Sequence, residues 1–145
     1  MSDNREFFIG KEYDFESKHL SENAVFYDPA DLTTHMFVTG MTGSGKTGLC
    51  VGIMEEAALQ NIPAIIIDPK GDLTNLVLHF PDLLPEDFEP WIDPEAARRE
   101  NKSIQDKASE TATMWKNGLA DWGLFKENIE KLKNSAEFTI YSPGS

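Results

Sequence analysis

Only one cysteine and three histidines occur among the 145 residues of the chain. A single cysteine, Cys50, cannot form an internal disulfide, and the scattered histidines do not have the spacing of a metal site. The longest aliphatic stretch is too short to span a bilayer, and the first ten residues do not resemble a secretion signal. From these absences we expect a cytoplasmic protein without a membrane segment.

Basic residues are scarce as well, because 13 lysines and arginines stand against 25 acidic residues and give a formal net charge of -12. Such a chain repels phosphate backbones overall and has no cluster of basic residues that would bind nucleic acid. The densest basic stretch, which contains Arg98, Arg99 and Lys102, is interspersed with acidic residues and is typical of a solvated helix face. We therefore expect any contact with DNA to come from regions outside this chain.

The order of the apolar patterns predicts an α/β fold. Residues 1–30 indicate an irregular or hairpin-like lead-in, and residues 31–145 form the expected α/β domain. Met36–Thr39 is a short β-prone run, Lys46–Gln60 has apolar residues at helical spacing, and Ala64–Asp68 is a second apolar run. A strand, a helix and a strand in this order form a βαβ unit, whose two strands are parallel.

A helical insertion is expected at about residues 81–135, between the second and third strands of the sheet. Asp93 followed by Pro94 is a favourable helix start. Two further helices are expected between residues 103 and 136, with interruptions near Gly118 and Gly123. The segment Glu137–Tyr141 is then the third expected strand.

The strongest motif is "GMTGSGKTG", which matches the phosphate-binding P-loop pattern G-x-x-x-x-G-K-[ST] between an expected strand and an expected helix. Its glycines permit backbone angles that let successive N–H groups point at phosphate oxygens, and the helix start adds a positive dipole end. Lys46 is expected to reach the β- and γ-phosphates of ATP, and the Thr47 hydroxyl is expected to coordinate Mg²⁺. The predicted cofactor-binding residues are Gly40, Met41, Thr42, Gly43, Ser44, Gly45, Lys46, Thr47 and Gly48.

A second stretch, "IIIDPKGDL", ends the second expected strand and contains two acidic residues. Parallel strands present their carboxyl ends at one edge of a sheet, so Asp68 is expected on the ligand side near Thr47. Two roles stay open for Asp68: a catalytic acid that orients the water bound to the metal, or a turn-forming acid before Pro69. Asp72 is expected to cap a short amphipathic helix that contains Leu73, Leu76, Val77 and Phe80.

Taken together, "THMFVTGMTGSGKTGLC" and "IPAIIIDPKGDL" resemble the core of the HerA/FtsK group of P-loop motor ATPases, and the HerA-like bacterial proteins in particular. The lead-in "VFYDPADLTTH" and the later "PEDFEPWIDPEAARRE" are similar to the same subgroup. This resemblance implies a RecA-like parallel sheet, Mg-ATP as cofactor, a homo-hexameric DNA-translocating motor or helicase, and a NurA-type nuclease as partner. Conjugation or secretion coupling ATPases of the TraG type have a similar D-P-K-G-[DE]-L segment and are the alternative within motors.

The same resemblance implies a later strand with the Walker B acid and an adjacent glutamate, which cannot be matched in this sequence. The segment "IIIDPKGDL" therefore has the sequence pattern of a Walker B strand, but it is not the Walker B strand that the resemblance implies. We expect an N-terminal piece of a larger ATPase with an incomplete RecA-like sheet, and we predict that the isolated chain does not turn over ATP, with Lys46 and Asp68 as its candidate catalytic residues. A standalone nucleotide-binding module without turnover is the alternative from another class.

Overall fold

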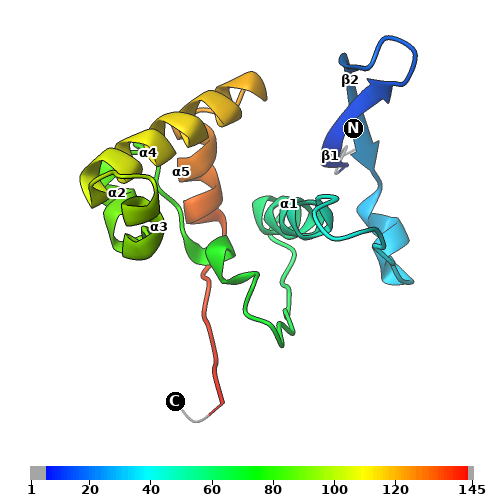
Figure 1. Ribbon diagram of the computed structural model, residues 1–145. Helices are drawn as coiled ribbons and strands as arrows, with labels where there is room; N and C mark the ends of the chain where they lie inside the picture. Colours follow the sequence, from blue (N-terminus) through cyan, green and yellow to red (C-terminus); the bar gives the residue numbers. More distant parts are fainter. Residues whose placement is uncertain (1–5, 144–145) are drawn as a thin grey trace. The chain divides into compact units, whose positions relative to one another are not determined.

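The computed structural model describes residues 6–143, which divide into two compact units (Figure 1). The first, here called the P-loop unit, comprises residues 6–77 and 135–143 of the described chain. The second, the helical unit, comprises Leu78–Asn134. No helix among the described residues is both long enough and apolar enough to cross a membrane.

The P-loop unit begins with an antiparallel hairpin of β1 (Phe7–Asp14) and β2 (His19–Tyr27), in which Phe7 pairs with Tyr27 and Asp14 with His19. The Asp14 carboxylate closes the turn, because its Oδ1 accepts hydrogen bonds from the backbone N–H groups of Glu16 and Ser17 at 2.8 and 3.3 Å. The lead-in that the sequence indicates as irregular or hairpin-like is thus a hairpin. It is followed by a 3₁₀ helix, η1 (Pro29–Thr33).

The expected helix after the P-loop is present as α1 (Lys46–Leu59). Its C-terminal end lies near β1, where the Gln60 side chain donates a hydrogen bond from Nε2 to the Glu6 carbonyl at 3.3 Å and Phe7 is only 1% exposed. Cys50, on this helix, is a half-buried free thiol. The packing of α1 against the hairpin is therefore the main tertiary contact that holds the P-loop helix.

The three expected parallel strands are not formed in the described chain, so the parallel sheet of the predicted fold is not confirmed. Met36–Thr39, Ala64–Asp68 and Glu137–Tyr141 belong to neither strand of the only sheet among residues 6–143, which has two strands. Ile65 and Tyr141 are 96% and 91% exposed. A parallel sheet is stable when both its faces are covered and several strands lie side by side. Among residues 6–143, these segments have neither neighbouring strands nor two covered faces.

The helical unit is built from short helices that start at residues the sequence marks clearly. They are α2 (Pro85–Phe88), η3 (Glu89–Trp91), α3 (Pro94–Arg99), α4 (Ile104–Asp121) and the main part of α5 (Lys126–Ser135). Asp93 caps α3 by accepting a hydrogen bond from the Glu95 N–H at 2.9 Å, as its position before Pro94 predicts. Gly123, with φ of 70°, lies between α4 and α5, whereas α4 runs through Gly118 without a break.

A small apolar core joins α2 to α4. Phe88, Ala108 and Ala112 are buried there, and the Phe80 and Phe88 rings meet edge to face with centroids 5.3 Å apart. Ala108 is 0% exposed, so α4 approaches α2 closely at a position without a long side chain. The core fixes the orientation of the first half of α4.

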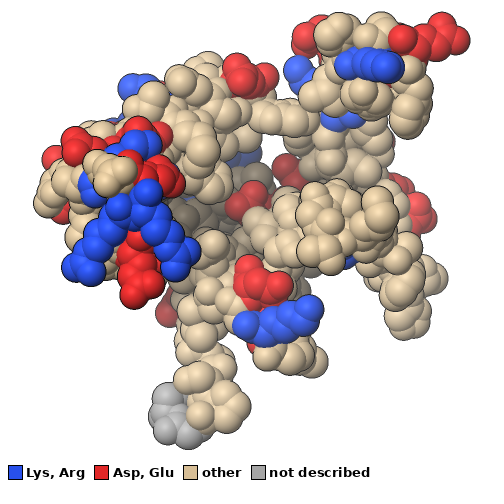
Figure 2. All heavy atoms as spheres, in the orientation of Figure 1, with Lys and Arg blue, Asp and Glu red and all other residues tan. Residues whose placement is uncertain are grey.

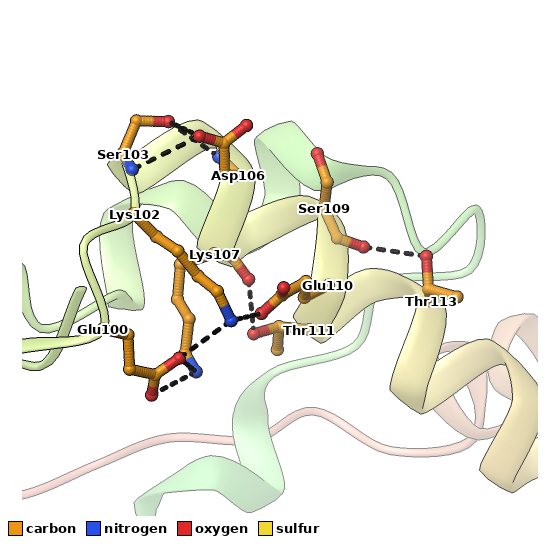
Figure 3. Close-up of polar contacts among 9 residues, drawn as sticks. All are labelled: Glu100, Lys102, Ser103, Asp106, Lys107, Ser109, Glu110, Thr111 and Thr113. Atoms are coloured by element: carbon orange, nitrogen blue, oxygen red, sulfur yellow. Dashed lines mark hydrogen bonds and ion pairs between the residues drawn. The ribbon is translucent and has the colours of Figure 1, made fainter.

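Charged side chains of both signs cover the outer surface of the helical unit where α3 meets α4 (Figure 2). Glu100 accepts hydrogen bonds from Lys102 at 3.0 Å and Lys107 at 2.7 Å, and Lys102 also contacts Glu110 at 2.7 Å (Figure 3). Arg99 lies 3.7 Å from Glu95. These ion pairs confirm the interpretation of this stretch as a solvated face of mixed charge.

Candidate nucleotide-binding site

The P-loop motif lies directly before α1 and forms a tight turn. Gly45 is the N-cap residue of α1 with φ of 86°, and Gly43 has φ of 79°. Both angles lie in the left-handed region, which a residue with a Cβ adopts only at a cost of about 1–2 kcal/mol. The two glycines therefore allow the chain to turn sharply into the helix at Lys46.

Gly40 is needed for a different reason, because the Ser44 side chain lies close to its backbone. A Cβ placed on Gly40 would lie 2.6 Å from the Ser44 Oγ and 3.5 Å from the Lys46 Cγ. Real Cβ atoms essentially never come this close to another heavy atom, so a side chain at this position would displace Ser44. The first and last parts of the motif are thus packed against each other around Gly40.

Several backbone donors at the start of α1 have no acceptor in the described chain. The first hydrogen bond of the helix runs from the Leu49 N–H to the Gly45 carbonyl at 3.0 Å, and within the loop the Ser44 N–H donates to the Met41 carbonyl at 3.2 Å. The N–H groups of Lys46 and Thr47 precede that first helical bond and are left open, as is usual for the first turn of a helix. Such open donors are the groups that bind phosphate oxygens at helix N-termini.

The charge at this helix end also suits an anion. No acidic residue occurs in the first turn of α1, although acidic residues outnumber basic residues by 25 to 13 in the chain. The partial positive charge of the helix N-terminus is therefore not neutralised by a neighbouring carboxylate. This partial positive charge and the Lys46 ammonium group together give the N-terminal end of α1 a positive electrostatic potential in an otherwise acidic chain.

The Lys46 side chain folds back over the loop. Its Nζ donates a hydrogen bond to the Met41 carbonyl at 2.5 Å, which closes a ring of six residues, Met41–Lys46. The ammonium group thus stays close to the backbone of the motif and does not pair with a carboxylate in the described chain. A phosphate bound to the loop would compete with this carbonyl for the ammonium protons.

Thr47 has the position expected for a magnesium ligand but not a preformed metal site around it. Its side chain is exposed, and the hydroxyl has no hydrogen-bond partner among residues 6–143. No group of three or more His, Cys, Asp or Glu residues capable of holding a metal ion occurs in the described chain. Mg²⁺ that arrives with a nucleotide needs few protein ligands, because phosphate and water oxygens supply most of its coordination.

Asp68 lies in a turn that its own carboxylate organises. Oδ1 accepts a hydrogen bond from the Gly71 N–H and Oδ2 accepts one from the Leu73 N–H, each at 2.9 Å. The Leu73 bond contributes most to holding the pKa of Asp68 below its usual value, against an opposing effect of desolvation and with further help from the Gly71 N–H. Gly71 has φ of 74°, and its carbonyl accepts a hydrogen bond from the Thr74 Oγ1 at 3.1 Å.

This turn changes two expectations about the second motif. Asp72 does not cap the helix that follows, because the described chain shows no hydrogen bond to its side chain and Asp68 accepts from the Leu73 N–H instead. The expected amphipathic helix up to Phe80 is only the 3₁₀ helix η2 (Thr74–Val77). Of the two roles considered for Asp68, its hydrogen bonds are those of the turn-forming acid.

One contact of the site, that of Lys46 with the Met41 carbonyl, was not anticipated from the sequence, whereas a turn-forming role was one of the two considered for Asp68. The Lys46 side chain bonds to the backbone carbonyl of Met41, and because every residue has such a carbonyl, the residue types do not indicate this contact. The pairing of Asp68 with Gly71 and Leu73 does have a signal, since Asp-Pro-x-Gly is a turn sequence in which the Asp side chain accepts hydrogen bonds from backbone groups further along the chain.

Comparison with known protein families shows a match over most of the chain. The family model described as "Helicase HerA, central domain" matches residues 17–141, which include the P-loop motif and the Asp68 turn. No curated protein and no solved structure matches the chain in the corresponding searches.

Proposed function

The chain belongs to the helicase HerA central-domain family, and from this premise we propose that it is the ATP-binding segment of a DNA-translocating motor ATPase. We further propose that residues 31–145 are the N-terminal part of a RecA-like ATPase domain with a parallel sheet, that residues 81–135 are its helical insertion, and that residues 1–30 are a lead-in. Family membership implies a P-loop fold and an ATPase motor. The specific action on DNA is part of the proposal.

The observation that carries nucleotide binding is the uncapped start of α1. Gly45 turns the chain into the helix in a left-handed conformation, the N–H groups of Lys46 and Thr47 have no acceptor in the described chain, and no acid lies in the first turn. A triphosphate would satisfy these donors and the helix dipole together. The residues proposed to hold it are Gly40, Met41, Thr42, Gly43, Ser44, Gly45, Lys46, Thr47 and Gly48.

Two side chains have specific roles in this proposal. Lys46 would leave the Met41 carbonyl, 2.5 Å away, and place its charge on the β- and γ-phosphate oxygens, where negative charge develops during phosphoryl transfer. Thr47 would offer its unpaired hydroxyl to the metal ion. Bound Mg²⁺ supplies charge neutralisation between the phosphates.

Asp68 is proposed as a residue that positions its loop. Each of its oxygens already accepts a backbone hydrogen bond at 2.9 Å, which supports this role over that of a catalytic acid. A catalytic role would require one oxygen to turn towards water and leave the Gly71 or the Leu73 N–H without its acceptor. Asp68→Asn in a turnover-competent protein separates the roles, because a turn residue affects loop order whereas a catalytic acid is essential for hydrolysis.

DNA contact is proposed to involve regions outside this chain, in a homo-oligomeric ring that works with a NurA-type nuclease. The charges support that division: the described lysines at the α3–α4 junction are paired with Glu100 and Glu110, and the whole chain has a net charge of -12. An isolated segment of this charge would not retain a phosphate backbone.

A second candidate function is a nucleotide-binding module without turnover. The observation that favours it is the engagement of both Asp68 oxygens together with the absence of an acid from the first turn of α1. Asp68 is thereby not free to activate water, and Asp72 is the remaining carboxylate of the two motifs. Both candidates share nucleotide binding and differ in hydrolysis by the intact motor.

Calorimetric titration of the 145-residue chain with Mg-ATP tests the shared step. We expect binding that is lost in Lys46→Ala, weakened in Thr47→Ala when Mg²⁺ is present, and unchanged in Lys70→Ala, the matched control with an exposed loop lysine. Equal affinity of Lys46→Ala and the parent chain would refute the site. A steady-state ATPase activity of the isolated chain that depends on Lys46 would refute the prediction that this chain alone does not turn over ATP.

A further inference from the structure

Met41, the second residue of the P-loop motif, has an exposed thioether side chain. It is 83% exposed, compared with 63% for Met114 and 37% for Met36, the other exposed methionines among residues 6–143. Met54 of α1 is half-buried. Because oxidation of methionine requires contact with the oxidant, Met41 is the described methionine that a dissolved oxidant reaches most readily.

The backbone carbonyl of Met41 organises the loop that the phosphates are proposed to occupy. It accepts hydrogen bonds from the Ser44 N–H at 3.2 Å and from the Lys46 Nζ. On the preceding residue, Gly40, a Cβ would lie 2.6 Å from the Ser44 Oγ, so the loop is closely packed at this point. The exposed thioether is thus attached to the same residue that holds the Lys46 ammonium group.

We propose that Met41 is a site of reversible oxidation by hydrogen peroxide, and that its sulfoxide weakens nucleotide binding by offering the Lys46 ammonium group a second acceptor. This inference rests on the nucleotide site proposed above. In the reaction, the methionine sulfur bonds to one peroxide oxygen and is oxidised by two electrons. The O–O bond breaks, and the other oxygen leaves as water with both hydrogen atoms of the peroxide. A methionine sulfoxide reductase restores the thioether, with a dithiol oxidised to a disulfide and water as product.

The oxidation makes an apolar side chain polar at the place where Lys46 has to change partners. Methionine is unbranched and has three rotatable bonds, so the sulfoxide oxygen can turn towards the ammonium group that lies at the carbonyl of the same residue. A bound phosphate would then have to displace two acceptors from Lys46 instead of one. A hydrogen bond to a charged group is strong enough to change the affinity by about tenfold.

The first test measures where peroxide reacts. The 145-residue chain is treated with hydrogen peroxide, and the sulfoxide at each methionine is quantified by mass spectrometry of its peptides. We expect Met41 to be oxidised faster than Met36 and Met54, and we expect saturating Mg-ATP to slow the reaction at Met41 but not at Met114 of the helical unit. Oxidation of Met41 no faster than that of the half-buried Met54 would overturn the proposal.

The second test measures the affinity for Mg-ATP by calorimetry before and after the treatment. Dithiothreitol is added first, because it reverses oxidation of Cys50 to a sulfenic acid or a disulfide and does not itself reduce methionine sulfoxide. We expect a loss of affinity of about tenfold that is regained after incubation with reductases for both sulfoxide epimers. Met41→Leu should have the same affinity before and after peroxide, whatever its starting value, whereas Met114→Leu should lose about as much as the parent chain.

A pair of variants tests the polarity of the side chain without an oxidant. Glutamine and leucine are both close to methionine in size, but only glutamine has an acceptor oxygen. Met41→Gln should therefore bind Mg-ATP more weakly than Met41→Leu. The same two substitutions at Met114, which is also exposed, should give equal affinities.

Three binding results would overturn the proposal and leave the nucleotide site in place. They are equal affinity of the parent chain before and after conversion of Met41, an equal loss in treated Met41→Leu, and equal binding by Met41→Gln and Met41→Leu. Each is measured on a chain that binds Mg-ATP. Failure of the untreated parent chain to bind Mg-ATP would refute the nucleotide site itself, and this proposal with it.

Discussion

The Asp68 carboxylate accepts a hydrogen bond from the backbone N–H of Leu73 at 2.9 Å, five residues further along the chain. The same carboxylate accepts from the Gly71 N–H, so one side chain spans the whole turn after the apolar run. These bonds give the acid that directly follows three isoleucines a structural role in the turn. Its negative charge is used to hold the backbone of its own loop.

The first prediction concerns the pH dependence of this turn. The Leu73 N–H and its neighbours hold the pKa of Asp68 below the usual value, so the ionised carboxylate favours the folded turn. A depressed pKa gives a contribution that is fully present above the unfolded pKa of about 3.9 and is lost as the pH falls through the folded pKa. Amide exchange at Gly71 and Leu73 should therefore be slow at neutral pH and should show lost protection only below about pH 4.

Asp68→Asn provides the matched variant. Asparagine has one acceptor oxygen where aspartate has two, so one of the two N–H groups loses its partner. We expect faster exchange at one of these amides at neutral pH, with a difference from the parent chain that disappears on acidification. Asp72→Asn is the control, since no hydrogen bond to the Asp72 side chain occurs in the described chain. If both variants behaved alike, the turn would not depend on Asp68.

The second prediction concerns the turn into α1. Alanine at Gly45 would have to adopt φ of 86°, which costs about 1–2 kcal/mol. Gly52→Ala lies inside the same helix with open space around its Cβ, and it should stabilise the chain by about 0.5–1 kcal/mol because alanine favours helix over glycine. Urea unfolding of the two variants should therefore give changes of opposite sign. A stabilising Gly45→Ala would mean that the loop does not need this backbone angle.

The helices and their ends could be predicted because their signals are local. Asp93 before Pro94 marks the start of α3, and Gly123 lies where α4 gives way to α5. Each of these features depends on residues within one turn of the chain. The prediction that failed locally is the break at Gly118, because a single glycine in a long helix costs only about 1 kcal/mol and the rest of α4 tolerates it.

The strands could not be predicted in the same way. Ala64–Asp68 and Glu137–Tyr141 have the composition of strands, but a strand forms only when another strand pairs with it. Composition reports a residue's preference and contains no information on whether the partner is present. The P-loop can be recognised from the residue types of its motif. The hydrogen bond between Lys46 and the Met41 carbonyl depends on backbone geometry, which the residue types do not specify.

The third prediction concerns Glu100, which joins Lys102 and Lys107 at the start of α4 (Figure 3). The hydrogen bond from Lys107, followed by that from Lys102, holds the pKa of Glu100 below its usual value. Its contribution to stability is therefore present above the unfolded pKa and lost as the pH falls through the folded pKa. Glu100→Gln should lower the melting temperature slightly at pH 7 in low salt, and the difference should shrink at pH 3 and in 1 M NaCl.

The matched control is Glu89→Gln, because Glu89 has no ion pair in the described chain. We expect its melting temperature to follow that of the parent chain at each pH and salt concentration. A loss for Glu100→Gln that persisted unchanged at pH 3 would show that the charge is not the cause.

The last prediction concerns the cap of α4. The Ser103 Oγ accepts a hydrogen bond from the Asp106 N–H at 3.0 Å and donates one to the Asp106 carboxylate at 2.7 Å, while the Ser103 N–H donates to the same carboxylate at 3.3 Å (Figure 3). Ser103→Ala removes both bonds of the hydroxyl, and loss of such a cap costs about 0.5–2 kcal/mol. Ser109→Ala is the control, because Thr113 bonds to the Ser109 carbonyl, which alanine retains. Chemical unfolding followed by helical circular dichroism should show a loss for Ser103→Ala alone. Equal losses for both variants would point to a general cost of serine replacement in α4, and would contradict capping as the reason that this helix begins at Ile104.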